Sequence, residues 1–209
     1  MSLADSRPRP DGPVRGRPRS EAVERAILEG VMKLLEEGVP LAELSIERVA
    51  RTAGVGKATI YRRWSGKEEL FVDVLRAAEP PDPVLPGTSM RDDLVVLLES
   101  LRQRGLLSRS SAILHNVYAQ MKSSPKIWTA YHANVIQPRR NLGLEVLRRG
   151  QLNGELRVGI DLELANDMFV GPMLVRSVMR PEADLPEGLA EEIVDTVLKG
   201  LRPVSSTSS

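Results

Sequence analysis

Apolar residues recur every three or four positions along most of this chain, which is the pattern of amphipathic helices. The first such stripe starts near Glu21, and the glycine and proline within residues 38–40 end it. A short helix capped by Ser45 follows, then another that begins near Lys57, and then a longer one over residues 67–79. No segment alternates between apolar and polar residues as a strand does, so the pattern predicts an all-α fold.

A proline-rich stretch, residues 80–87, divides the helices into two groups because so many prolines cannot continue a helix. The second group is predicted at residues 89–103, 108–121, 125–149, 161–180 and 187–201. Pro138 and Pro172 fall inside two of these helices and should kink or break them. The chain therefore divides into a flexible basic arm (1–20), an N-terminal head (21–79), a helical body (80–203) and a disordered serine-rich tail (204–209).

The overall charge gives no reason to expect a nucleic-acid or membrane partner, since Lys and Arg number 29 and Asp and Glu number 28. Any affinity for DNA must come from a local patch. The chain has no cysteine, which excludes disulfides, thiolate nucleophiles and cysteine metal sites. The N-terminus lacks the apolar stretch of a signal peptide, and no run approaches the roughly 20 apolar residues of a membrane span. We expect a cytoplasmic protein without a membrane partner.

Residues 45–70 predict a helix-turn-helix, in which two short helices are joined by a turn that contains Gly54. Ala50 is small where the two helices would cross, and Ile60 can fill the space between them. The second helix carries hydroxyl, phenol and cationic side chains in one compact run, which suits insertion into the major groove of double-stranded DNA. Residues 65–67 open a further helix, whose first backbone N–H groups could bind a phosphate.

Residues 53–70 read AGVGKATIYRRWSGKEEL and resemble the run A-G-V-S-x-x-T-x-Y-x-x-F-x-x-K-E-x-L of the TetR family of bacterial regulators. Gly56 stands where a capping serine is common and Trp64 where phenylalanine is usual; both are tolerable, because glycine is an acceptable N-cap and tryptophan is a large aromatic core residue. The match covers mainly residues 21–79, and a Gly-Glu-Leu-Arg loop at 154–157 is also similar to members of the family. The resemblance implies a homodimeric, ligand-responsive regulator that binds operator DNA.

The resemblance also implies which residues of the head meet DNA. The positions that tend to meet bases in this family are Lys57, Ala58 and Tyr61. The positions that more often hold phosphates are Thr59, Arg63 and Lys67. Ser45 starts a helix aimed at the DNA backbone, and Arg62 suits either role. As alternatives, Thr59 could bond its own helix backbone and Tyr61 could be a core aromatic residue, as Trp64 is expected to be.

The body is expected to hold a ligand pocket and the dimer interface. The last two predicted helices have apolar faces too broad for one chain to cover easily, so they would pair with their copies in a second subunit; packing within one chain is the alternative. The residues assigned to that interface are Phe169, Met173, Leu189, Ile193 and Val197. The middle helices carry bulky side chains with polar tips, which suit a small-molecule pocket although each could equally be a core residue. These are His115, Tyr118, Met121, Trp128, Tyr131 and His132.

The arm carries the run Arg-Gly-Arg-Pro-Arg at residues 15–19, which resembles the extended core that AT-hook peptides place in the minor groove. Arg15 and Arg17 would then follow the negative floor of an A·T-rich groove beside the recognition helix. The alternative is a basic leader that adds only non-specific attraction to DNA.

Other classes of protein fit the sequence less well. Residues 54–59, GVGKAT, suggest a phosphate loop, but Arg51 stands where its first glycine belongs and Ala58 replaces the hydroxyl that holds magnesium. There is no nucleophile elbow, and the two histidines, His115 and His132, lie in separate predicted helices without a carboxylate at metal-site spacing. We therefore predict no catalytic residue, metal site or cofactor.

The leading hypothesis is a repressor released from its operator by a small molecule. An activator, a DNA-binding regulator without an effector, and a ligand carrier or enzyme with a vestigial helix-turn-helix are the alternatives.

Overall fold

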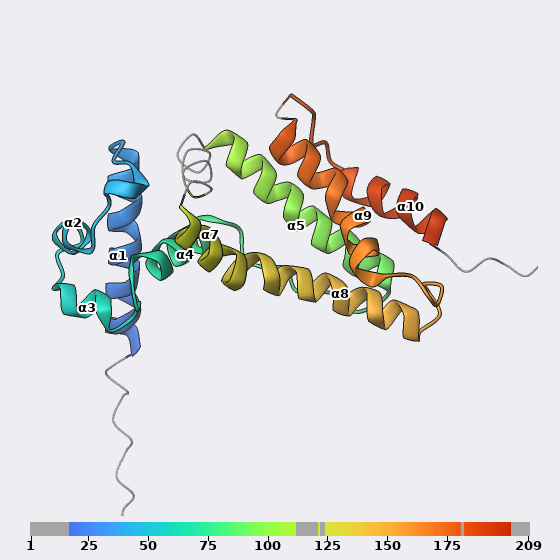
Figure 1. The fold of residues 1–209 in the computed structure, drawn as a ribbon, viewed down its shortest axis with the longest axis horizontal. Helices are drawn as coiled ribbons and strands as arrows, with labels where there is room; N and C mark the ends of the chain where they lie inside the picture. The colour runs from blue at the N-terminus through green and yellow to red at the C-terminus, as the bar shows by residue number, and fades with distance from the viewer. Residues whose placement is uncertain (1–16, 112–120, 122–123, 181, 202–209) are drawn as a thin grey trace, which may run out of the picture.

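The computed structural model describes residues 17–111, 121, 124–180 and 182–201, and every regular element in these ranges is helical (Figure 1). The helices of the head are α1 (Arg17–Glu36), the 3₁₀ turn η1 (Leu41–Glu43), α2 (Ile46–Thr52), α3 (Lys57–Tyr61) and α4 (Lys67–Ala78). Those of the body are α5 (Met90–Ser110), α7 (Pro125–Tyr131), the π-helical turn η2 (His132–Ile136), α8 (Gln137–Leu152), α9 (Leu162–Leu174), the π-helical turn η3 (Val175–Met179) and α10 (Leu189–Leu201). The predicted all-α class is confirmed.

Helix α1 begins earlier than the sequence pattern predicts, at Arg17 instead of Glu21. Pro18 is compatible with this start because proline is favoured in the first turn of a helix, where its missing N–H has no partner in any case. Arg17 therefore lies in a helix, and the expectation of an extended segment through it is wrong. Arg15 and Gly16 lie outside the described residues.

Helix α5 runs to Ser110, well beyond the expected end at residue 103. Gly105 is buried inside this helix because η3 crosses it there. A Cβ atom added at Gly105 would lie 2.6 Å from Ser177 Oγ. The helix expected at 108–121 is thus in part the end of α5, and residues 112–120 and 122–123 lie outside the described part of the chain.

The long helix expected at 125–149 is interrupted by the π-helical turn η2, which ends one residue before Gln137 and two before Pro138. Proline removes a backbone donor and crowds the preceding turn, so a widened turn at this place relieves the clash. The helix expected at 161–180 likewise passes from α9 into the π-helical η3 after Pro172. An irregular turn therefore precedes Pro138, whereas Pro172 lies inside α9, which stays α-helical to Leu174.

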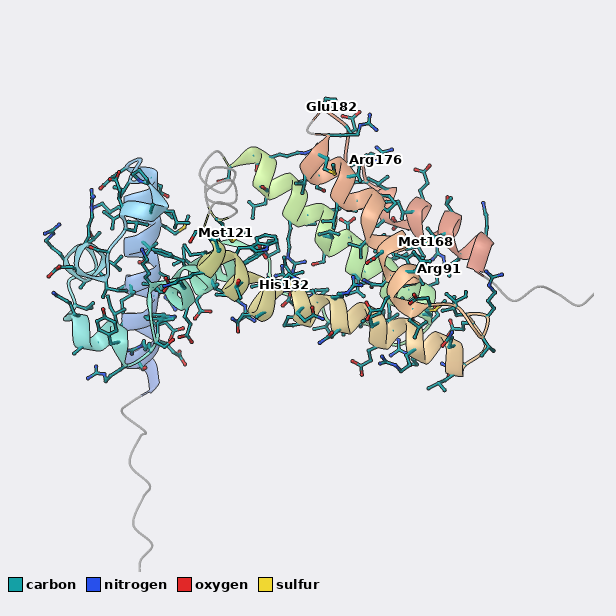
Figure 2. The ribbon with its side chains drawn as sticks, viewed as in Figure 1. Arg91, Met121, His132, Met168, Arg176 and Glu182 are labelled. Atoms are coloured by element: carbon teal, nitrogen blue, oxygen red, sulfur yellow. The ribbon has the colours of Figure 1, made fainter. Side chains whose placement is uncertain are left out.

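The described residues form two hydrophobic cores, and the boundary between them does not coincide with the proline-rich linker. The first core joins α1 to α4 and also contains four residues from beyond the linker, namely Met121, Ile127, Tyr131 and Val135. The second core lies among α5, α8, α9 and α10. Figure 1 shows the result: α7 lies against α4, and α8 continues from it into the body. Figure 2 marks Met121 at the head and His132 further along toward α8.

The residues assigned to the dimer interface are mostly buried within one chain. Phe169 and Met173 have no exposed surface, and Leu189 and Ile193 are also buried in the second core, where Val197 packs against them. Within this chain, α9 and α10 bury most of these side chains against α5 and against each other. A different stripe of α9 and η3 is exposed instead, and it consists of Leu164, Met168, Leu174, Val175, Val178 and Met179. We call these six residues the α9 stripe; Figure 2 marks Met168.

No helix in the described ranges is both long enough and apolar enough to cross a membrane. The same residues contain no group of three or more His, Asp or Glu side chains that could hold a metal ion.

Candidate DNA-binding surface

The turn between α2 and α3 is built as the sequence predicts. Gly54 has φ +66°, a left-handed conformation that glycine adopts without steric cost. Ala50 on α2 and Ile60 on α3 are buried beneath the turn. Helix α1 passes close behind it, since a Cβ atom added at Gly30 would lie 3.2 Å from the Ala53 Cβ atom. Small residues at this crossing let the three helices hold α3 at the surface of the head.

One face of α3 is exposed, and it carries the residues expected to read bases. Lys57, Ala58, Tyr61 and Arg62 are all exposed, at helix positions i, i+1, i+4 and i+5, which share one side of a helix. Tyr61 is therefore not a core residue. This face offers an ammonium group, a phenol and a guanidinium group over about one and a half turns.

Two of the residues expected to hold phosphates, Thr59 in α3 and Arg63 just after it, make contacts within the head. The Arg62 guanidinium lies 3.4 Å from Thr59 Oγ1, and Arg63 donates to the Thr59 carbonyl at 3.2 Å. Arg63 also donates to the carbonyl and the hydroxyl of Ser20 in α1, at 3.1 and 2.9 Å. Arg63 therefore fixes the end of the recognition helix against the start of α1, a role that the sequence did not indicate.

The first turn of α2 supplies a cap and an acidic partner for the recognition helix. Ser45 is the N-cap of α2, and its exposed Oγ accepts a hydrogen bond from Arg48 N at 3.2 Å. Its hydroxyl proton can still be donated to a phosphate. Glu47 forms an ion pair with Lys57, and this hydrogen bond and charge lower the pKa of the Glu47 carboxyl. Sequence reasoning missed Glu47 because ten residues separate the partners, with a turn between them.

The start of α4 lies directly after the recognition helix and is partly closed to a phosphate. Ser65 donates from its backbone N–H and its hydroxyl to Glu69, at 2.7 and 2.8 Å, and these bonds lower the Glu69 pKa. Lys67 is the first residue of α4 and is half-buried. Trp64 is buried as expected, and its indole N–H donates to Asp73 at 2.8 Å.

The structure separates the residues expected to line a ligand pocket. Met121 and Tyr131 are buried in the core of the head, so as folded here they pack against protein and are not open to a ligand. The Tyr131 hydroxyl donates to Glu79 at 3.1 Å. Trp128 and His132 are exposed one turn apart, with ring centroids 6.4 Å from each other. His115 and Tyr118 lie outside the described residues.

Comparison with known proteins decides the family. A profile described as "Bacterial regulatory proteins, tetR family" matches residues 27–74, and one described as "Tetracyclin repressor-like, C-terminal domain" matches residues 85–197. The chain belongs to the TetR family. Its head and its body are therefore both those of TetR-family transcriptional regulators, for which homodimers and ligand binding are typical.

Similarity to individual TetR-family members extends over nearly the whole chain. The chain is 31% identical over 197 residues to the uncharacterised HTH-type transcriptional regulator YdeS of Bacillus subtilis, a match that covers 93% of this chain and 98% of YdeS. It is 26% identical over 186 residues to the DNA-binding transcriptional repressor TetR of Mycobacteroides abscessus, with 88% and 94% covered. The crystal structure of the TetR family transcription regulator SCO0332 has a TM-score of 0.58 at 26% identity, covering 87% of this chain and 99% of that one.

Proposed function

We propose that this chain is a homodimeric repressor that binds operator DNA through α3 and is released from it by a small-molecule ligand. The observation that carries the proposal is the exposed face of α3, where Lys57, Ala58, Tyr61 and Arg62 lie together on a helix whose other side is buried. Donors and cations of this kind can bind base edges in the major groove, while neighbouring cations bind phosphates. The name of the M. abscessus relative favours repression over activation. With DNA as its partner, we expect the protein to act in the cytoplasm.

The dimer is proposed to form through the α9 stripe. Its six apolar side chains are exposed along one helix and its π-helical continuation, whereas the apolar face of α10 is buried. A contiguous exposed apolar surface on a monomer marks an interaction site. In a two-fold dimer the same stripe would meet its own copy, so one surface serves both subunits.

Trp128 and His132 are the described residues that we propose as part of the ligand site. Both are exposed on the helix that links the head core to the body. The chain has only two tryptophans, and the other, Trp64, is buried in the head. In a Trp64→Phe variant the fluorescence of Trp128 would report ligand binding. A compound library can then be screened both for quenching and for release of a labelled operator, and compounds that do one without the other would contradict the proposed site.

The DNA-binding function is tested by sequencing the genomic fragments that the purified protein retains. We expect an enriched motif with two half-sites about one helical turn apart, since a symmetric dimer meets successive major grooves. Arg62→Ala should weaken retention and blur the motif, whereas Arg148→Ala, which removes an exposed arginine of α8, should not. Fragments enriched no more than random DNA would contradict the proposal.

A further inference from the structure

Two arginines of the body reach two carboxylates of the segment that joins head and body. Glu79 is the C-cap residue of α4, and Asp82 follows it in the linker. Arg104 of α5 has its Nε 3.2 Å from Glu79 Oε2 and its Nη2 2.6 Å from Asp82 Oδ1. Arg139 of α8 has its Nη2 2.7 Å from Glu79 Oε2 and its Nε 2.9 Å from Asp82 Oδ1. Each guanidinium thus pairs with both carboxylates.

Three of these four groups are largely withdrawn from solvent, and the fourth, Asp82, is 53% exposed. The Glu79 side chain is 3% exposed, that of Arg104 is 10% exposed and that of Arg139 is 26% exposed. Burial and the charge of Arg139 lower the pKa of Arg104, while Glu79 and Asp82 act in the opposite direction. For Arg139, burial lowers the pKa but the two carboxylates outweigh it. A buried charge is stable only while its partners stay in place, so Glu79, Arg104 and Arg139 depend on one arrangement.

The cluster lies at the boundary between the two hydrophobic cores. Two irregular segments of the described chain cross this boundary, the linker from Glu79 to α5 and the π-helical turn η2, whose Val135 packs in the first core; the end of helix α5 also reaches that core through Leu107. Glu79 and Asp82 lie on the linker. Tyr131, which donates to Glu79, comes directly before η2, and Arg139 lies three residues after its end. The same set of contacts therefore joins the linker to the residues that flank η2. Both segments are irregular in structure, whereas the helices on either side of them are regular and packed.

We propose that Glu79, Asp82, Arg104 and Arg139 form a latch that fixes the orientation of the head relative to the body, with the linker and η2 as the hinge beneath it. Packed cores move as rigid units, so a change in head orientation must be absorbed by the irregular segments between them. The latch is formed from charges on both sides of this hinge, and it opens when the two cores rotate apart. These residues position the recognition helix and need not touch DNA. The link to operator binding rests on the function proposed above.

The test compares two adjacent arginines of α8. Arg139→Gln removes one arm of the latch, whereas Arg140→Gln removes ion pairs to Glu163 and Asp167 of α9, which stay within the body. The side chains of Arg139 and Arg140 are similarly exposed, at 26% and 30%. Because the chain lacks cysteine, spin labels can be attached to Glu36→Cys on α1 and Glu145→Cys on α8, both exposed. Mixing with excess unlabelled chain leaves one labelled copy per dimer.

We expect Arg139→Gln to broaden the distribution of head-to-body distances and Arg140→Gln to leave it as in the parent. Operator affinity should fall about 5- to 150-fold in Arg139→Gln, the range of a typical coupling between sites, while affinity for an isolated half-site stays unchanged. Asp82→Asn is a second variant for the case that Arg139→Gln does not fold, since Asp82 is 53% exposed and its loss buries no unpaired carboxylate.

Unchanged distances in both Arg139→Gln and Asp82→Asn would overturn the latch. Broadened distances with an unchanged operator affinity would overturn its role in positioning the recognition helix. If the parent protein binds no specific DNA, the proposed function fails, but the distance measurements still decide whether the latch exists.

Discussion

The proposed dimer interface is tested most directly by a charge placed on the α9 stripe. Val178 of η3 is 57% exposed, so a partner that covers it would bury a little more than half of its surface. Full burial of such a side chain stabilises by about 1.5–3 kcal/mol, and the exposed part of Val178 therefore corresponds to about 0.9–1.7 kcal/mol. A two-fold dimer contains every substitution twice.

Val178→Asp should therefore weaken dimerisation by about 2–3.5 kcal/mol, or about 30- to 400-fold in the dimer Kd, before any cost of burying the new charge. Val158→Asp is the matched control, because Val158 is 89% exposed but lies in the loop between α8 and α9, away from the stripe. Sedimentation velocity over a range of protein concentrations measures the Kd of both variants. Equal dimer Kd values for Val178→Asp, Val158→Asp and the parent would show that the dimer does not form through the α9 stripe.

Three further outcomes are expected. Lys67→Ala should weaken binding to all DNA and lower the salt slope of log K by about one unit. Lys57→Ala should mainly reduce the preference for the operator sequence, at a cost of about 1–3 kcal/mol. Titrations at several salt concentrations separate the two effects, and identical sequence preference in both variants would contradict this division. Deletion of residues 1–16 should weaken operators with A·T-rich flanks more than those with G·C-rich flanks if the arm reads a minor groove, and an equal loss in binding assays at one salt concentration leaves it only a non-specific role. Gly54→Ala should lower the free energy of unfolding by about 1–2 kcal/mol, because the φ of Gly54 is +66°. Gly56→Ala is the control and should not lower it, because the φ of Gly56 is −74°. Equal urea midpoints for the two variants would show that the turn tolerates a side chain at Gly54.

Features that depend on neighbours in sequence could be predicted. Ser45 caps α2, and Ser89 caps α5 by accepting a hydrogen bond from Asp92 N at 3.0 Å. Gly54 takes the left-handed conformation that the turn needs. The exposed face of α3 also follows from the motif, because residues one turn apart lie on the same side of a helix whatever surrounds it.

Features that depend on distant partners could not be predicted. An apolar stripe shows that a helix face is covered but not what covers it, so Phe169 and Met173 were assigned to a second subunit when α9 buries them in its own chain. The true end of α5 was missed as well, because Gly105 packs inside this helix against Ser177, 72 positions further along the chain. The partners of Glu79 are likewise spread over α5, α7 and α8, and no local spacing brings them together.

The head of this protein is not an exchangeable cassette, because its core is completed by a helix encoded far downstream. Ile127, Tyr131 and Val135 pack into the head core. A fragment cut at the proline-rich linker would therefore leave the surface of α4 that they cover exposed to solvent. Chimaeras that graft this head onto the body of a relative should carry residues 121–136 with it, and should join the chains at the start of α8. A graft that cuts only at the linker would leave the new head facing a foreign α7, and the mismatch should lower both its stability and the yield of folded protein.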